Sequence, residues 1–194
     1  NAFNRAFEKL SFVSRIGVEG QRMRVFEMQA IQKTSNNLTI VNAQKIISNI
    51  RLLKNSNEIE NLKKAINIAE VSLKKTLEHV TINKNEIEIK NFLIQQLFQN
   101  GAENLAFDPI VLSGANSALP HGNSRSDNTI KNGDCLLFDF GASVNGYHSD
   151  ITRTFFVGSV SDEHKKIYEA VLKAKELGKE ISKPTLTLHE LDDK

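Results

Sequence analysis

The feature that most constrains the fold is a pair of β-prone segments between residues 133 and 158. The first, Cys135 to Phe140, is apolar, and the second, Ile151 to Val157, is rich in β-branched and aromatic residues, which favour strands. Asn145-Gly146 lies between them, and this dipeptide is a strong signal for a hairpin turn. We therefore expect two antiparallel strands joined by a tight turn.

An aspartate interrupts the first of these segments. Asp139 lies within the apolar run, and Asp150 follows eleven residues later. If the turn centres on Val144-Asn145, the two aspartates face each other directly. If it centres on Asn145-Gly146, Asp139 faces Thr152 and Asp150 is its diagonal neighbour. Because strand side chains alternate with period two, both registers put the carboxylates on one face, roughly 5 to 7 Å apart.

Two interpretations of this pair are open from the residues alone. Carboxylates are almost never fully buried unless they are paired or bind a metal, and two unpaired carboxylates this close would repel each other. One or two hard divalent cations between Asp139 and Asp150 would remove that repulsion. Alternatively, Asp139 pairs with Arg153 or Lys131, or caps a turn, and has a purely structural role.

The hairpin also resembles a known motif. Its residues are Leu137-Phe138-Asp139-Phe140-Gly141-Ala142, then Gly146-Tyr147, then Ser149-Asp150-Ile151-Thr152-Arg153-Thr154-Phe155. This pattern is similar to the first metal-ligand hairpin of the M24 metallopeptidases, the "pita-bread" enzymes, which include methionine aminopeptidase, Xaa-Pro aminopeptidase (aminopeptidase P) and Xaa-Pro dipeptidase (prolidase). The resemblance implies that Asp139 and Asp150 bind two Mn²⁺ ions, with Co²⁺ or Zn²⁺ as alternatives, and that Asp150 bridges the two ions.

A second segment carries a candidate catalytic histidine. His121 lies in a loop of small and polar residues that also contains Gly114, Asn116 and Ser117. From chemistry alone, a loop histidine is usually solvated or structural. The spacing, however, resembles the M24 pattern G-x-N-[SA]-x-x-x-H, in which the histidine lines the active site and hydrogen-bonds the substrate near the scissile bond. The resemblance implies that role for His121.

The chain divides into two parts by pattern. Residues 55–194 show amphipathic helices from about Asn57, Asn85 and Asp162, in addition to the hairpin. We expect an α+β (α/β) fold in which these helices pack on a curved, mainly antiparallel sheet. The resemblance implies that residues 55–194 form the first half of a pita-bread (creatinase/aminopeptidase-like) catalytic domain, and that residues 1–54 are the end of a preceding N-terminal domain, which short methionine aminopeptidases lack.

Composition excludes several classes of protein. The net charge is only +2, and no Lys/Arg cluster suggests nucleic-acid binding. No apolar run approaches the roughly 20 residues that span a membrane. The single cysteine, Cys135, rules out an internal disulfide framework and agrees with a cytoplasmic location.

The function expected from the resemblance is that of a Mn-dependent aminopeptidase. It would release the N-terminal residue from peptides with proline in second position, by attack of a metal-bridging hydroxide, and the family's common homodimer is one assembly it could form. Prolidase activity on Xaa-Pro dipeptides is an alternative, and a metal-free pita-bread binding module is another. The family's remaining ligands, one His and two Glu, lie downstream of the third helix. We therefore expect residues 1–194 to be a truncated piece that binds metal weakly and does not catalyse by itself.

Overall fold

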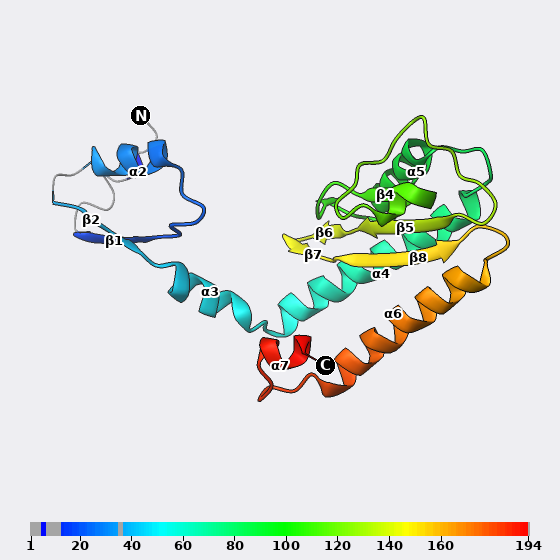
Figure 1. Cartoon of the computed structure of the whole chain (residues 1–194). Helices are drawn as coiled ribbons and strands as arrows, with labels where there is room; N and C mark the ends of the chain where they lie inside the picture. The colour runs from blue at the N-terminus through cyan, green and yellow to red at the C-terminus, as the bar shows by residue number, and fades with distance from the viewer. Residues whose placement is uncertain (1–4, 7–12, 35–36, 194) are drawn as a thin grey trace. The chain divides into compact units, whose positions relative to one another are not determined.

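The computed structural model describes residues 5–6, 13–34 and 37–193. Contacts within the chain divide it into two compact units, Asn1–Asn57 and Glu58–Lys194 (Figure 1). The boundary lies close to the one expected from the sequence pattern. The interpretation of residues 1–54 as the end of a separate N-terminal domain stays a prediction.

The first unit contains two parallel strands. β1 (Arg15–Val18) pairs with β2 (Thr39–Asn42), and the connection between them carries α2 (Val25–Gln32). β2 is followed by α3 (Gln44–Leu52), and none of the α3 side chains is buried. This unit therefore has little apolar core among its described residues.

The second unit contains four helices. They are α4 (Ser56–His79), which starts at the boundary between the units, α5 (Glu86–Gln99), α6 (Asp162–Ile181) and α7 (Leu188–Asp192). The start of α5 is defined by Asn85 and Glu88, each of which accepts a hydrogen bond from the other's backbone N–H, the arrangement of a capping box. None of the described helices is long and apolar enough to cross a lipid bilayer.

Six strands of the second unit form two small antiparallel sheets (Figure 1). One sheet has the order β4-β5-β8, and the other has the order β3-β6-β7. Their bounds, with the 3-10 helix η1 that follows β4, are β3 (Asn104–Leu105), β4 (Ile110–Ser113), η1 (Gly114–Ala118), β5 (Cys135–Phe140), β6 (Ala142–Val144), β7 (Tyr147–His148) and β8 (Ile151–Phe156). The expected mixture of helices and antiparallel sheet is confirmed.

The core lies between α4, α5 and one face of the β4-β5-β8 sheet. Phe138 and Phe140 of β5 are fully buried there, together with Leu93 and Leu97 of α5. Burial along β5 alternates strictly, so the intervening side chains are only partly buried. On the opposite face, the ring of Phe156 contacts His164 and Tyr168 of α6. The sheet therefore has one dry face and one partly open face.

The hairpin turn is the tight one that its dipeptide predicts. Val144 pairs with Tyr147, and the two residues between them, Asn145 and Gly146, both have positive φ values of 49° and 76°. These are the features of a type I′ turn, which matches the twist of the flanking strands. Of the two registers considered, the one centred on Val144-Asn145 is wrong.

The hairpin changes direction halfway along its length, between β5 and β6. A β-carbon on Gly141 would overlap with the carbonyl oxygen of Ser149, which lies between β7 and β8. The Ser149 hydroxyl instead accepts a hydrogen bond from the Ala142 N–H, at 2.9 Å. Glycine is therefore required at position 141, where the two backbones approach more closely than a side chain allows.

Candidate active site

Asp139 lies on the partly open face of the sheet, directly opposite Thr152. The Thr152 hydroxyl donates a hydrogen bond to Oδ1 of Asp139, at 3.1 Å. The carboxylate is half-buried rather than fully buried. The physical reason is the period of two, because Leu136, Phe138 and Phe140 point towards the core formed with α4 and α5, and Asp139 points to the other face.

A purely structural ion pair for Asp139 is not seen. The Arg153 guanidinium donates to the carbonyl of Thr152, at 2.9 Å, and the backbone N–H of Lys131 donates to Asp134. Within residues 5–6, 13–34 and 37–193, no Lys or Arg makes an ion pair with Asp139. One carboxylate oxygen thus has a hydroxyl partner, and the negative charge has no counter-ion in this part of the chain.

Asp150 precedes β8 and is exposed. It lies two residues before Thr152, so alternation along the extended chain puts it on the same face as Thr152 and Asp139. The pairing register also makes Asp150 the diagonal neighbour of Asp139, as the second of the two predicted registers requires. The hairpin therefore presents two carboxylates on one face.

A pocket of about 300 Å³ brings His121 to the same region as Asp139. Thr152 also lines it, and the rest of the lining is mainly apolar and comes from β4, η1, the loop after η1 and β5. Asp150 is not among the described residues that line this pocket. The structure therefore places the predicted histidine and one of the two predicted aspartates around the same pocket. The apolar lining of this pocket suits an uncharged side chain of a ligand.

The backbone holds His121 in an unusual conformation. The N–H of Gly122 donates to the carbonyl of Leu119, at 3.2 Å, with Pro120 and His121 between them. Proline in second position and a positive φ of 53° at His121 are the features of a type II turn. A non-glycine residue with this φ costs roughly 1 to 2 kcal/mol, and such residues often mark functional positions.

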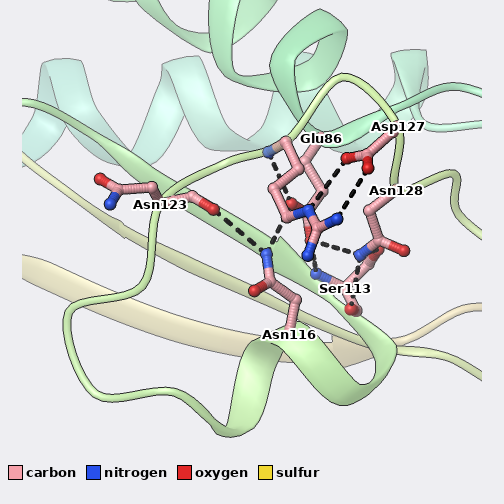
Figure 2. Close-up of polar contacts among 7 residues, drawn as sticks. Glu86, Ser113, Asn116, Asn123, Asp127 and Asn128 are labelled. Atoms are coloured by element: carbon pink, nitrogen blue, oxygen red, sulfur yellow. Dashed lines mark hydrogen bonds and ion pairs between the residues drawn. The ribbon is translucent and has the colours of Figure 1, made fainter.

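A carboxylate that sequence reasoning missed contacts residues on both sides of this loop in the sequence, among them Asn116 and Asn128 (Figure 2). Glu86, the first residue of α5, is fully buried and accepts four hydrogen bonds from residues 113–128. The sequence signal was weak, because an acidic residue in the first turn of a helix is common for dipole reasons alone. Nothing in the local sequence shows that its partners lie 27 to 42 residues away.

A surface ion pair closes the outer edge of the same cluster (Figure 2). The Arg125 guanidinium donates to both carboxylate oxygens of Asp127, at 2.9 and 2.7 Å. This hydrogen bonding raises the pKa of Arg125 and lowers the pKa of Asp127. Both side chains are well exposed, so the pair contributes little to stability.

The residues on the sheet face fit a hard divalent cation in part. Carboxylate oxygens are the ligands that Mn²⁺ and similar ions prefer, and the Thr152 hydroxyl fixes the orientation of one carboxylate, as the outer partners of metal ligands commonly do. The described part of the chain has no group of three or more His, Cys, Asp or Glu side chains placed around one ion. Among the described residues, the site therefore offers two candidate ligands for a divalent cation, Asp139 and Asp150.

Comparison with known proteins identifies the family. The model of the metallopeptidase family M24 matches residues 60–194, which include both aspartates and the His121 loop. The chain belongs to family M24. Membership of this metallopeptidase family implies a divalent metal in its complete members.

Individual M24 proteins are similar over nearly the whole chain. A Xaa-Pro dipeptidase from Pyrococcus furiosus is 37% identical over 190 residues, which are 98% of this chain and 54% of that protein. The crystal structure of an X-Pro aminopeptidase from Thermotoga maritima superposes with a TM-score of 0.88, at 32% identity, and covers 99% of this chain and 54% of that one. The prolidase from Pyrococcus horikoshii gives a TM-score of 0.89, at 34% identity and with 98% and 55% coverage.

These matches confirm the predicted fold over only part of each relative. The chain has the mixed α/β pita-bread architecture over about half the length of the structures that it matches. It likewise spans about half the length of the curated M24 relatives. The roles of the site residues and the activity of the whole protein are therefore matters of proposal.

Proposed function

We propose that this M24 chain is part of a Mn-dependent aminopeptidase that releases the N-terminal residue from peptides with proline in second position. The observation that carries the proposal is the pocket in which His121 lies with Asp139, a carboxylate without a protein counter-ion among the described residues. The relatives named Xaa-Pro dipeptidase and X-Pro aminopeptidase support the proline specificity.

In this proposal, each residue of the site has a separate task. Asp139 and Asp150 hold the metal, and the Thr152 hydroxyl keeps the Asp139 carboxylate in one orientation. His121 hydrogen-bonds the substrate near the scissile bond, and the apolar wall of the pocket contacts the apolar parts of the peptide. Bound Mn²⁺ supplies Lewis acidity for hydrolysis. In this proposal the metal needs further ligands besides Asp139 and Asp150.

Prolidase activity is the second candidate. The curated relative with 37% identity is a Xaa-Pro dipeptidase, and both activities cleave the same kind of bond. They differ in whether the substrate continues beyond proline. Parallel assays of an Xaa-Pro dipeptide and an Xaa-Pro tripeptide distinguish them. A cytoplasmic location and a homodimer remain predictions.

The experiment that tests the proposal replaces Asp150 in the complete protein. We expect Asp150→Ala to reduce Mn-dependent cleavage of both peptides at least a hundredfold, because loss of a metal ligand exceeds the 10- to 100-fold effect of losing an outer partner. Asp162→Asn is the matched control, since Asp162 is an exposed aspartate in the first turn of α6. Unchanged cleavage by Asp150→Ala would refute the metal assignment. Peptide binding without cleavage in the wild-type protein would favour the metal-free binding module.

A further inference from the structure

Glu86 has no task in the proposed chemistry, although it is a carboxylate with no exposed surface (0% exposed). Burial of an ionisable group is costly unless its hydrogen bonds are satisfied. Its position is also specific, because it starts α5 and faces the segment that carries β4, η1 and the His121 turn (Figure 2). A buried carboxylate beside a candidate catalytic loop calls for a physical explanation.

The two oxygens of Glu86 are each satisfied by two neutral donors. Oε1 accepts from the Ser113 N–H and from the Asn128 side-chain amide, at 2.5 and 2.8 Å. Oε2 accepts from the Asn116 side-chain amide and from the Arg125 N–H, both at 2.8 Å. A glutamine would point its NH₂ group at two donors in either orientation. Only a carboxylate fits all four.

Asn116 connects this carboxylate to the His121 turn. Its side-chain amide donates to Glu86 and also to the carbonyl of Asn123, at 3.2 Å, two residues after His121. Its backbone carbonyl accepts from the N–H of Leu119, at 3.1 Å, two residues before His121. The turn is therefore held on both sides by the residue that Glu86 orients.

We infer that Glu86 is a positioning residue for His121. It acts through Asn116 and fixes the strained turn that carries His121 at the pocket, which His121 lines together with Asp139. This inference rests on the role that the proposed function gives to His121. Glu86 does not contact the pocket itself, since it is not among the described residues that line it.

The competing explanation is that Glu86 only stabilises the fold. Substitutions of two asparagines that bind Glu86 distinguish between the two explanations. Asn116 and Asn128 each donate one amide hydrogen bond of 2.8 Å to Glu86. Only Asn116 continues to the His121 turn, whereas Asn128 continues to Ser113 at the end of β4. Asn116→Ala and Asn128→Ala therefore remove equivalent bonds from Glu86 but have different consequences for His121.

The first measurement is kcat/KM for Mn-dependent cleavage of an Xaa-Pro peptide by the complete protein. We expect Asn116→Ala to lower it about tenfold or more, because small displacements of a catalytic group are costly, and Asn128→Ala to keep it within about threefold. In a His121→Ala background, Asn116→Ala should cause no further loss, because it acts only through His121. Equal losses in the two single variants, or the same loss with and without His121, would overturn the inference.

Glu86→Gln provides a second test of the same inference. Although it is nearly isosteric, it should lower kcat/KM about a hundredfold, and Glu86→Asp should not restore activity, because the shorter side chain cannot reach all four donors. Full activity of Glu86→Gln, with its fold intact by circular dichroism, would overturn the inference.

Hydrogen exchange separates this inference from the proposed function. If the wild-type protein cleaves no Xaa-Pro peptide, the proposed function fails, but the turn can still be measured. We expect the amides of Leu119 and Gly122 to exchange faster in Asn116→Ala and at the wild-type rate in Asn128→Ala. The same exchange rates in both variants would show that Glu86 does not position the turn.

Discussion

Glu86 and Asp139 lie near the two ends of β4, and their surroundings are opposite. Ser113, the last residue of β4, donates to Glu86, whereas Ile110, the first, pairs with Asp139. Glu86 is fully buried and accepts four hydrogen bonds, but Asp139 is half-buried and accepts a single hydroxyl. The difference shows how one functional group, the carboxylate, can have two different surroundings in the same fold. The Glu86 carboxylate has all its hydrogen bonds satisfied within the fold, whereas the Asp139 carboxylate, with one hydroxyl partner, is the one proposed to bind a cation.

The largest effect expected from this comparison is on stability in the absence of metal. Glu86→Ala leaves four donors without their acceptor and should lower the free energy of unfolding by about 3 to 5 kcal/mol. Asp139→Ala removes one hydrogen bond, from the Thr152 hydroxyl, and should change the free energy of unfolding by less than about 1 kcal/mol. Urea denaturation in the presence of a chelator measures both. Similar losses in the two variants would contradict the comparison.

A smaller effect is expected in the hairpin that carries Asp139 and Asp150. Gly141→Ala should lower the free energy of unfolding by about 2 to 3 kcal/mol, because the new methyl group overlaps with the Ser149 carbonyl and the backbone must move. The matched control is Gly178→Ala in α6, where a β-carbon meets nothing within 4 Å and helix propensity favours alanine. Thermal denaturation compares the two. A neutral Gly141→Ala would show that the hairpin tolerates a different path, and that the relative placement of the two aspartates is not fixed by this contact.

The smallest expected effect is on how the free energy of unfolding depends on pH, through His79, which lies close to the α4–α5 connection that precedes Glu86. His79 at the end of α4 stacks on Phe92 of α5, with ring centroids 3.8 Å apart, and its Nε2 lies 2.7 Å from the Lys84 ammonium. Burial, followed by the Lys84 charge, lowers the pKa of His79. The folded state therefore binds fewer protons than the unfolded state below about pH 6.5, the ordinary value for histidine.

The stabilising contribution of neutral His79 is thus complete above that pH and decreases as the pH falls towards the lowered pKa. Thermal denaturation between about pH 7.5 and about pH 5.5 should show a smaller loss of stability for His79→Phe than for the wild-type protein. His148→Gln, at an exposed position in β7, serves as the control and should follow the wild type. An identical pH dependence of stability in all three proteins would show that protonation of His79 does not affect the free energy of unfolding.

Much of the fold could be predicted from local patterns. Asn145-Gly146 predicted a tight turn, and the structure has one, with positive φ at both residues. A third helix was predicted from about Asp162, and α6 starts there, with the Ser161 side chain accepting a hydrogen bond from the His164 N–H. These features depend on neighbours within a few residues, so the chemistry that decides them is visible in the sequence.

The burial of β5 is harder to predict from the sequence than these local features. An apolar run without strict alternation indicates a strand covered on both faces, yet Cys135, Leu137 and Asp139 lie on a partly open face. The number of layers that cover a sheet is a property of the assembled fold. Periodicity alone does not report it.

The sequence by itself determined the hairpin, the amphipathic helices, and the spacing of Asp139, Asp150 and His121 on which the family resemblance rests. Only the tertiary structure decided that His121 and Asp139 share a pocket, and that Glu86 contacts Asn116, which bonds to both sides of the His121 turn. The physical reason is separation along the chain. Glu86 and Asn116 are 30 residues apart, and a contact of that span depends on how α5 packs against β4, which no local propensity encodes.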